Sequence, residues 1–415
     1  MPILPILLLL SLSPLFAQSF SLQTLQQQLD QAPPHSTFNI PIGFYQGNLE
    51  INQPIVLNGQ KGVIFDGNRQ GHVIKINAPN VTIQNIKIQN SGFNLTNLDA
   101  GIFVTKKAEN TIIKNNIFYH NASGMWLDAC HGAQILNNKI EGDLSIRSQD
   151  RGNGIHLFNV QNTLVDNNEI WHTRDAIYID TSNFNTLQNN NMHDLRYGVH
   201  YMYSYNNKVL NNYSHHTRSG YALMQSKYLT VIGNRSENDE NYGILMNFIT
   251  KSTIKNNIIK GIKQGGSVGL DLGGLAEEGK AIFIYNSLYN EISGNLFQDS
   301  GIGIHLTAGS EDNTIFANSF INNHTQVKYV ANRQQEWSVN KKGNFWSDYL
   351  GWDRDNNGVG DRPYIPNDNI DKLLWKYPLA KVLMHSPAVE ILRYVQHQFP
   401  VLQSPGVRDS YPLMR

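Results

Sequence analysis

The stretch that decides the fold runs from Gly154 to Asn257, where GIHL at residue 154 is followed by AIYI at 176, GVHY at 198, GYALM at 220 and GIL at 243. These starts lie 22, 22, 22 and 23 residues apart. Short apolar alternations at this period are typical of a solenoid of β-strand coils, because one coil cannot bury its apolar face alone. An asparagine follows each start after 14 residues: Asn168, Asn190, Asn212, Asn234 and Asn257.

The repeat continues on both sides of this stretch. Two steps are longer, with 30 residues before Gly154 and 38 residues before Ala281. The excess falls in residues 141–153 and 261–279, which are rich in glycine and charge, so we expect loops there that leave the coils regular. The further coil starts are Gly101, Gly124, Ala281 and Gly303.

Length and charge limit the class of protein. The 415 residues are enough for two or three domains, but a repeat through most of the chain indicates one elongated domain. Lysine plus arginine and aspartate plus glutamate number 33 each, so no overall field attracts nucleic acid. We assign residues 20–340 to the solenoid, 341–369 to a loop block and 370–415 to a helical C-terminal segment.

The first residues have the character of an export signal. The apolar segment 3–16 is too short to cross a bilayer, so we assign residues 1–19 to a secretory signal peptide and predict no transmembrane span. Leucines at helical spacing follow in residues 22–29. A helix there would cover the open edge of the first coil.

The solenoid interior follows from strand alternation. Residues one and three places after each start should point inward, as Ile155 and Leu157 do in their coil. The asparagine column should form an internal ladder of amides. Cys130 is the only cysteine, which excludes an internal disulfide, and we interpret it as a small buried residue. A second inward strand is expected near Ile112, Ile135, Val165, Leu187, Val209, Val231, Ile254, Ile292 and Ile315.

The outward positions are unusual because they carry aromatic, histidine and methionine residues instead of lysine, glutamate and threonine. Trp126, His156 and Tyr178 are the members that we predict to contact a protein partner. Equivalent residues on adjacent coils lie about 4.8 Å apart, and residues i and i+2 on one strand about 6.6 Å apart. Neighbouring coils are therefore able to share one ion.

A second column of histidines precedes the coil starts. Imidazole and thioether ligands without thiolate suit copper, and Cu(I) above all. The alternative is that these side chains stack on one another without an ion. The predicted copper set, bound transiently, is His172, His193, His200, Met202, His215, His216 and Met224.

Two features follow the repeat. In GWDRDNNGVGDRPY, the oxygen side chains at 353, 355, 357 and 361 have the spacing of a calcium loop, although Tyr364 stands where an EF-hand has glutamate. Turns held by hydrogen bonds alone are the alternative. Residues 371–384 and 386–399 are predicted to form two helices, whose apolar faces cap the solenoid or dock another subunit. The calcium candidates are Asp353, Asp355, Asn357 and Asp361, and the docking candidates are Leu373, Trp375, Leu392 and Phe399.

GNFWSDY at 343–349, DRDNNGVGDRPY at 353–364 and the tail from 371 to 414 resemble the NosD family of periplasmic accessory proteins in the maturation of nitrous oxide reductase. That resemblance implies a right-handed parallel β-helix. It also implies a non-enzymatic role with an ABC-type permease and its ATPase, to which the C-terminal helices dock and which holds the protein at the membrane. Copper would come from a chaperone lipoprotein and pass to apo nitrous oxide reductase.

The competing class is a β-helix hydrolase, lyase or epimerase acting on uronate-type polymers. Such an enzyme needs paired carboxylates, or a carboxylate with a basic partner, on one outer face. Asp128, Asp175 and Asp180, with Arg147 and Arg174, are the candidates. The NTD, DD, GHG and RIK segments of polygalacturonases and the DPHD segment of alginate epimerases are absent. A purely structural adhesin is a third class.

Overall fold

The structure, a computed structural model, describes residues 19–263, 279–307, 309–330, 333–368, 370–371, 377, 386–398 and 405–414. Several predictions fall elsewhere. The structure does not describe the proposed signal peptide apart from Ser19, most of the second predicted loop, or most of the first predicted C-terminal helix. Leu373, Trp375 and Phe399 also lie outside the described residues.

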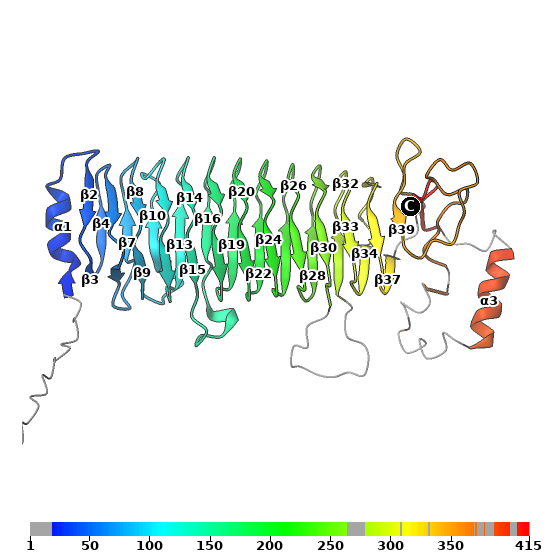
Figure 1. Cartoon of the computed structure of the whole chain (residues 1–415), viewed down its shortest axis with the longest axis horizontal. Helices are drawn as coiled ribbons and strands as arrows, with labels where there is room; N and C mark the ends of the chain where they lie inside the picture. The colour runs from blue at the N-terminus through cyan, green and yellow to red at the C-terminus, as the bar shows by residue number, and fades with distance from the viewer. Residues whose placement is uncertain are drawn as a thin grey trace, which may run out of the picture.

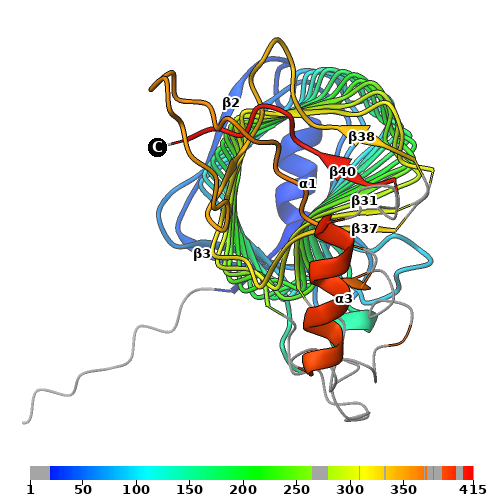
Figure 2. The ribbon, with the colours of Figure 1, turned by 90° about the vertical axis from the view of Figure 1, so that its right-hand side faces the viewer.

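The coils stack into a right-handed parallel β-helix with three sheets along its length (Figures 1 and 2). In the repeating coils the chain passes from sheet A to sheet C and then to sheet B. Sheet A contains 14 strands and sheets B and C contain 12 each. The fold is therefore the all-β solenoid that the period predicts.

The strand bounds are as follows. Sheet A consists of β1 (Ser19–Ser21), β3 (Gly43–Gln46), β6 (Val63–Asp66), β9 (Lys87–Gln89), β12 (Ile117–Tyr119), β15 (Lys139–Glu141), β18 (Glu169–Trp171), β21 (Asn191–His193), β24 (Tyr213–His215), β27 (Arg235–Glu237), β30 (Ile258–Lys260), β33 (Leu296–Gln298), β36 (Ser319–Ile321) and β39 (Phe345–Trp346). Sheet B consists of β2 (Thr37–Ile40), β5 (Val56–Gly59), β8 (Thr82–Gln84), β11 (Ile112–Lys114), β14 (Gln134–Leu136), β17 (Leu164–Asp166), β20 (Thr186–Gln188), β23 (Lys208–Leu210), β26 (Thr230–Ile232), β29 (Thr253–Lys255), β32 (Glu291–Ser293) and β35 (Thr314–Phe316). Sheet C consists of β4 (Leu49–Ile51), β7 (Ile74–Ile76), β10 (Ala100–Val104), β13 (Ser123–Asp128), β16 (Ile155–Phe158), β19 (Asp175–Asp180), β22 (Tyr197–Met202), β25 (Ser219–Met224), β28 (Tyr242–Asn247), β31 (Lys280–Tyr285), β34 (Ile302–Thr307) and β37 (Thr325–Val330).

The interior is filled as the alternation predicts. Ile155, Leu157, Ile177 and Ile179 are fully buried, and so is Cys130. One residue of the second inward strand is misplaced by the prediction. In β11 it is Ile113 that is buried and pairs with Ile135, while Ile112 is partly exposed. Because both residues are isoleucine, composition alone does not fix the register of this strand.

The asparagine ladder is present and buried. The backbone N–H of Asn168 donates to Oδ1 of Asn190 at 3.0 Å, and Asn190 donates in the same way to Asn212. Each side-chain amide also donates to a carbonyl of the preceding coil, as Nδ2 of Asn190 does to Val165 at 3.0 Å. The ladder therefore satisfies the buried polar groups at the corner between sheets B and A.

Both ends of the stack are covered. At the N-terminal end, helix α1 (Leu22–Asp30) buries Leu22, Leu25 and Leu29, and Ser21 caps it by accepting from the backbone N–H of Gln23. This confirms the predicted capping helix. Its apolar face removes the first coil's interior from water.

The last ten described residues cover the other end, and they are extended where a helical segment was expected. Strand β40 (Val407–Arg408) pairs with β38 (Gln335–Glu336). The carboxylate of Asp409 accepts from the backbone N–H of Asn344 at 2.7 Å and from Nε1 of Trp346 at 2.9 Å. Asp409 thus terminates the asparagine ladder, which ends at Asn344.

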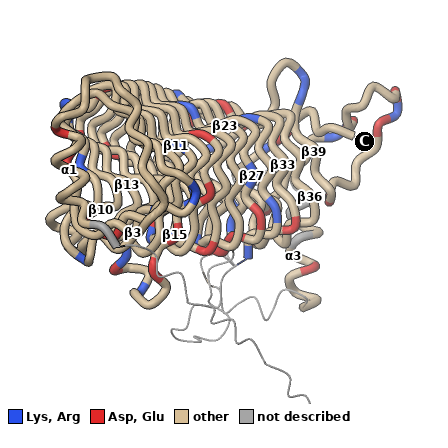
Figure 3. Tube along the Cα trace, turned by 60° about the vertical axis from the view of Figure 1, so that its left-hand side comes forward, with Lys and Arg blue, Asp and Glu red and all other residues tan. Residues whose placement is uncertain are grey.

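The second predicted C-terminal helix forms as α3 (Pro387–Gln398), and the backbone N–H of Val389 donates to Oγ of Ser386 at 3.4 Å. Its surface includes Ile391, Leu392 and Tyr394, which are 62%, 54% and 66% exposed. Among the described residues, no helix is long and apolar enough to cross a membrane. Basic and acidic residues are interspersed along the rod (Figure 3).

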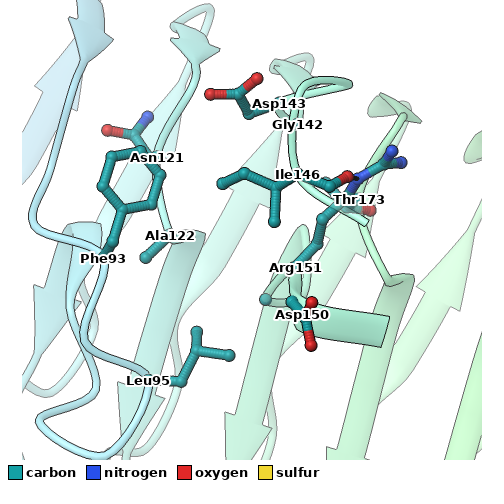
Figure 4. A pocket seen from close by; sticks show the side chains of 11 residues that line it. Phe93, Leu95, Asn121, Ala122, Gly142, Asp143, Ile146, Asp150, Arg151 and Thr173 are labelled. Atoms are coloured by element: carbon teal, nitrogen blue, oxygen red, sulfur yellow. Dashed lines mark hydrogen bonds between the residues drawn. The ribbon is translucent and has the colours of Figure 1, made fainter. Parts of the chain in front are cut away.

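The first predicted loop is an insertion that packs back onto the stack. It includes a short 3-10 helix, η1 (Ser148–Asp150), and Arg151 donates to the carbonyls of Ile146 at 2.7 Å and His172 at 3.0 Å. Phe93 and Ile146 face each other across a cavity of about 10 Å³ (Figure 4). That volume holds about one water molecule, so the contact is structural and not a ligand site.

Candidate functional site

The outward side of sheet C carries a column of stacked rings. The register places Trp126 beside His156, His156 beside Tyr178, and Tyr178 beside His200. The three successive ring-centroid distances are 3.6, 4.7 and 4.6 Å. His156 is only 7% exposed, and burial, with the nearby Arg174 charge, lowers its pKa to about 3. It therefore packs as a neutral ring and is not free to contact a partner, whereas Trp126 and Tyr178 are partly exposed.

A buried carboxylate orients the next histidine of this column. Asp175 is fully buried, and its Oδ2 lies 3.0 Å from Nδ1 of His200. Arg196 donates to the same carboxylate from Nε at 2.7 Å and from Nη2 at 2.6 Å. Burial alone would raise the pKa of Asp175, but the hydrogen bonds from His200 and Arg196 hold it below its usual value. An ionised Asp175 accepts a hydrogen bond from Nδ1–H of His200, so Nε2 is the ring nitrogen left to bind a metal ion.

Two thioethers lie on the same face as His200. His200 and Met202 both point outward from β22, about 6.6 Å apart as residues i and i+2 of a strand. Tyr201 pairs with Leu223, so Met202 and Met224 end neighbouring strands about 4.8 Å apart. All three side chains are partly exposed. The fold thus brings one oriented imidazole and two thioethers to one surface.

A separate histidine cluster lies at the corner where sheet A turns into sheet C. The rings of His193 and His215 stack with centroids 4.9 Å apart. The Nδ1 atoms of His215 and His216 lie 2.9 Å apart, and Nδ1 of His193 lies 2.7 Å from Oδ2 of Asp194. Burial, with His193 and His216 close by, lowers the pKa of His215. Neutral imidazoles at this spacing are able to share a proton or a metal ion.

The seven candidate copper ligands do not lie together on one surface. His193 and His200 are separated by the turn from sheet A to sheet C, so the corner histidines and the group of His200, Met202 and Met224 lie on different sheets. His172 belongs to neither group. Its equivalent in the next coil is Asp194, and only the coil after that has a histidine, His216, at the same position. Among the described residues, no group of three or more histidine, cysteine, aspartate or glutamate side chains is placed to hold a metal ion.

The loop proposed for calcium uses its oxygen atoms internally. Asp353 accepts from the backbone N–H groups of Asn357 at 3.1 Å and Gly358 at 2.8 Å. Asn357 donates to Asp355 at 2.8 Å, and Asp361 accepts from the backbone N–H of Arg354 at 3.0 Å. These are the bonds of a tight turn. The geometry supports the hydrogen-bonded alternative and gives no support to calcium.

The carboxylates considered for sugar chemistry lie on separate strands or in ion pairs. Asp175 is held in the ion pair with Arg196, and Arg147 pairs with Asp150 in the exposed loop. Phe158 stands between Asp128 and Asp180 in the register, so the two carboxylates are two strands apart, about 9.6 Å. The thiol of Cys130 is equally unreactive, since burial raises its pKa to about 12.

Sequence reasoning missed the role of Asp175 in the site. The available signal was a charged residue directly before the inward pattern AIYI, at the start of a strand in a sheet where β13, β22 and β25 begin with the uncharged residues Ser123, Tyr197 and Ser219. A charge at such a buried edge needs a partner. His200 and Arg196, one coil later, supply it.

The stacked coils define a right-handed β-helix protein, and residues 47–146 match the family model described as a right handed beta helix region. The A-module of the mannuronan C-5 epimerase AlgE6 from Azotobacter vinelandii is 13% identical with a TM-score of 0.58, covering 74% of this chain and 90% of that one. The adhesin PfbA from Streptococcus pneumoniae is 12% identical with a TM-score of 0.54, covering 74% and 96%. At these identities the likeness shows the fold alone.

Within that class the family is specific. Residues 136–351 match the family model described as NosD, periplasmic copper-binding protein. The probable ABC transporter binding protein NosD of Pseudomonas aeruginosa is 54% identical over 91% of this chain and 88% of its own length. The protein of the same description from Stutzerimonas stutzeri is 50% identical over 95% and 90%. The chain belongs to the NosD family.

Proposed function

We propose that this chain is a non-enzymatic carrier that accepts copper from a chaperone lipoprotein and delivers it to apo nitrous oxide reductase. It would act in the periplasm beside an ABC-type permease and its ATPase subunit. Membership of a family described as periplasmic copper-binding supports the cargo, and the description of the relatives as ABC transporter binding proteins supports the association. The observation that carries the copper assignment is His200, oriented by Asp175 beside two thioethers.

The chemistry of this group suits a cargo ion that must leave again. Thioether sulfur is a soft ligand and favours Cu(I), and Nε2 of His200 adds one stronger donor. The carboxylate of Asp175 fixes the ring and makes its nitrogen more basic, as second partners of metal-binding histidines do. Because all three side chains stay partly exposed, an acceptor protein can approach from outside the sheet.

The corner histidines are a second, weaker candidate for the same cargo. His215 and His216 already face each other with nitrogen atoms 2.9 Å apart. However, His193 is engaged by Asp194, and no thioether of the described chain stands at this corner, because Met192 points into the core. We therefore place Cu(I) on sheet C.

Helix α3 is the element that we propose to dock the permease. Leu392 lies on its surface beside Ile391 and Tyr394, and all three are more than half exposed. Contiguous exposed apolar side chains of this kind are typical of a surface that binds another protein or a membrane. The C-terminal segment would then have two roles: residues 405–414 cap the solenoid, and α3 docks the permease.

The test is a Cu(I) competition titration of the soluble protein. The triple variant His200→Asn, Met202→Leu and Met224→Leu should lose at least tenfold in affinity, because it removes all three proposed donors and keeps an apolar side chain of similar size at each methionine position. The matched control is His193→Asn, His215→Asn and His216→Asn, which should bind within about threefold of wild type. Unchanged Cu(I) binding by the sheet C variant would remove the proposed site.

A further inference from the structure

A row of exposed aromatic residues runs along the corner between sheets C and B. We call Phe184, Tyr203, Tyr228, Phe248 and Tyr289 the aromatic ridge; they are 56%, 46%, 44%, 49% and 56% exposed. They occupy five consecutive coils, and the first and last lie about 19 Å apart along the stack. That length matches the contact region of one protein partner better than a single small ligand.

The backbone makes this row costly to keep. All five residues have positive φ, between 48° and 60°. Each turn at this corner has two residues with positive φ, and equivalent positions carry Asn159, Asn162, Asn206 and Asn286, which tolerate that conformation far better than a ring-bearing side chain does. Large apolar side chains that are both strained and exposed gain nothing for folding. Their presence is explained if another surface covers them.

The charge in the middle of the ridge, around Tyr228, is one-sided. The Lys227 ammonium lies 4.9 Å from the ring centroid of Tyr205, and both Lys227 and Lys251 lie within 6 Å of Tyr228. In the described part of the chain, neither lysine takes part in an ion pair. The turns at 203–207, 225–229, 248–252 and 286–290 contain no aspartate or glutamate. The middle of the ridge therefore complements a carboxylate-bearing surface, while Asp312 in the following coil lies beside Tyr289 at one end.

A groove of about 410 Å³ lies within the ridge, with Tyr203 and Phe248 on its sides and Gln225, Lys227 and Thr250 between them. The polar groups between the rings need hydrogen-bond partners that a lipid tail does not supply and a polypeptide does. The groove also borders the proposed copper site, since Tyr203 follows Met202 and Gln225 follows Met224.

We infer that the aromatic ridge is the docking surface for a protein with an acidic contact face that exchanges copper with this chain at Met202 and Met224. This inference rests on the proposed function and assigns the partner's binding surface to the aromatic ridge. Aromatic side chains are the usual centres of binding energy in such interfaces, and flanking charges set the rate of association.

The test measures binding of two probes to the full chain by surface plasmon resonance: the soluble domain of the copper chaperone and apo nitrous oxide reductase. Tyr203→Asn with Phe248→Asn places a residue suited to positive φ at both positions, so the variant should fold, and it should bind one of the probes at least tenfold more weakly. Lys227→Gln with Lys251→Gln should slow association several-fold and flatten its salt dependence. Lys106→Gln with Lys107→Gln, an exposed pair in the same corner of an earlier coil, is the control and should bind as wild type does.

Cu(I) affinity of the isolated chain should stay within twofold in all of these variants, which separates the ridge from the copper site. Wild-type binding of both probes by both ridge variants would overturn the inference. The inference would also be overturned if the ridge variants lost binding to an acidic oligosaccharide, such as tetragalacturonate, or to anionic vesicles, while they bound both protein probes as wild type does. The ridge would then serve a different partner.

Discussion

Removing one rung of the asparagine ladder should destabilise the whole stack. In Asn212→Ala, the backbone N–H of Asn190 loses its acceptor at 3.0 Å, and the carbonyl of Leu187 loses the amide that donates to it at 3.0 Å. Both residues are buried. A buried polar group left without a partner costs roughly 1–3 kcal/mol, so the two together should lower the free energy of unfolding by about 2–6 kcal/mol.

The assay is urea unfolding followed by far-ultraviolet circular dichroism. Asn191→Ala is the matched control, because Asn191 is adjacent to a ladder residue but lies on the outward side of β21, partly exposed. It should change stability by no more than about 0.5 kcal/mol. If Asn212→Ala lowers the free energy of unfolding by less than about 1 kcal/mol, the ladder does not stabilise the corner between sheets B and A as we expect. Neighbouring groups would then rearrange to satisfy the backbone N–H of Asn190.

Two further predictions concern buried carboxylates. Burial raises the pKa of Asp239 from 3.8 to about 6, so the wild-type protein should lose up to about 3 kcal/mol of stability as pH rises from about 4 to 6. Asp239→Asn should lack this loss, and parallel urea midpoints for the two proteins across that pH range would contradict it. Asp409→Ala removes the acceptor for Asn344 and Trp346 and should lower stability by about 2–5 kcal/mol, with Asp409→Asn less affected. Thermal unfolding followed by tryptophan fluorescence measures this, and equal midpoints would show that the C-terminal cap does not depend on this carboxylate.

The sequence contains most of the information for the coils because each coil meets the same requirement. Every turn of chain must bury an apolar strip and satisfy the polar groups at its corners, so the period, the inward residues and the ladder recur visibly. The error at Ile112 arises because two isoleucines are adjacent there, so the alternation does not tell which of them points inward. The extended segment at 405–414 was not predictable, since β40 pairs with a strand about seventy residues earlier.

The candidate site was harder to predict than the fold. Spacing along a solenoid tells which residues share a column, and it correctly placed His193 beside His215 and Tyr178 beside His200. It does not tell on which side of a corner a column lies. His193 and His200 are seven positions apart, and the turn between them puts one on sheet A and the other on sheet C.

The ladder also bears on how such a protein changes over time. The Asn138 to Asn168 bond measures 2.9 Å across thirty residues of chain, and the Asn257 to Asn295 bond measures 2.9 Å across thirty-eight, the same as across an uninterrupted coil. An insertion between sheets A and C therefore leaves the ladder between sheets B and A unaltered, because the coils above and below still meet at their usual spacing. Lineages are free to lengthen, shorten or exchange these excursions and acquire new contacts, while the rod that presents them stays the same.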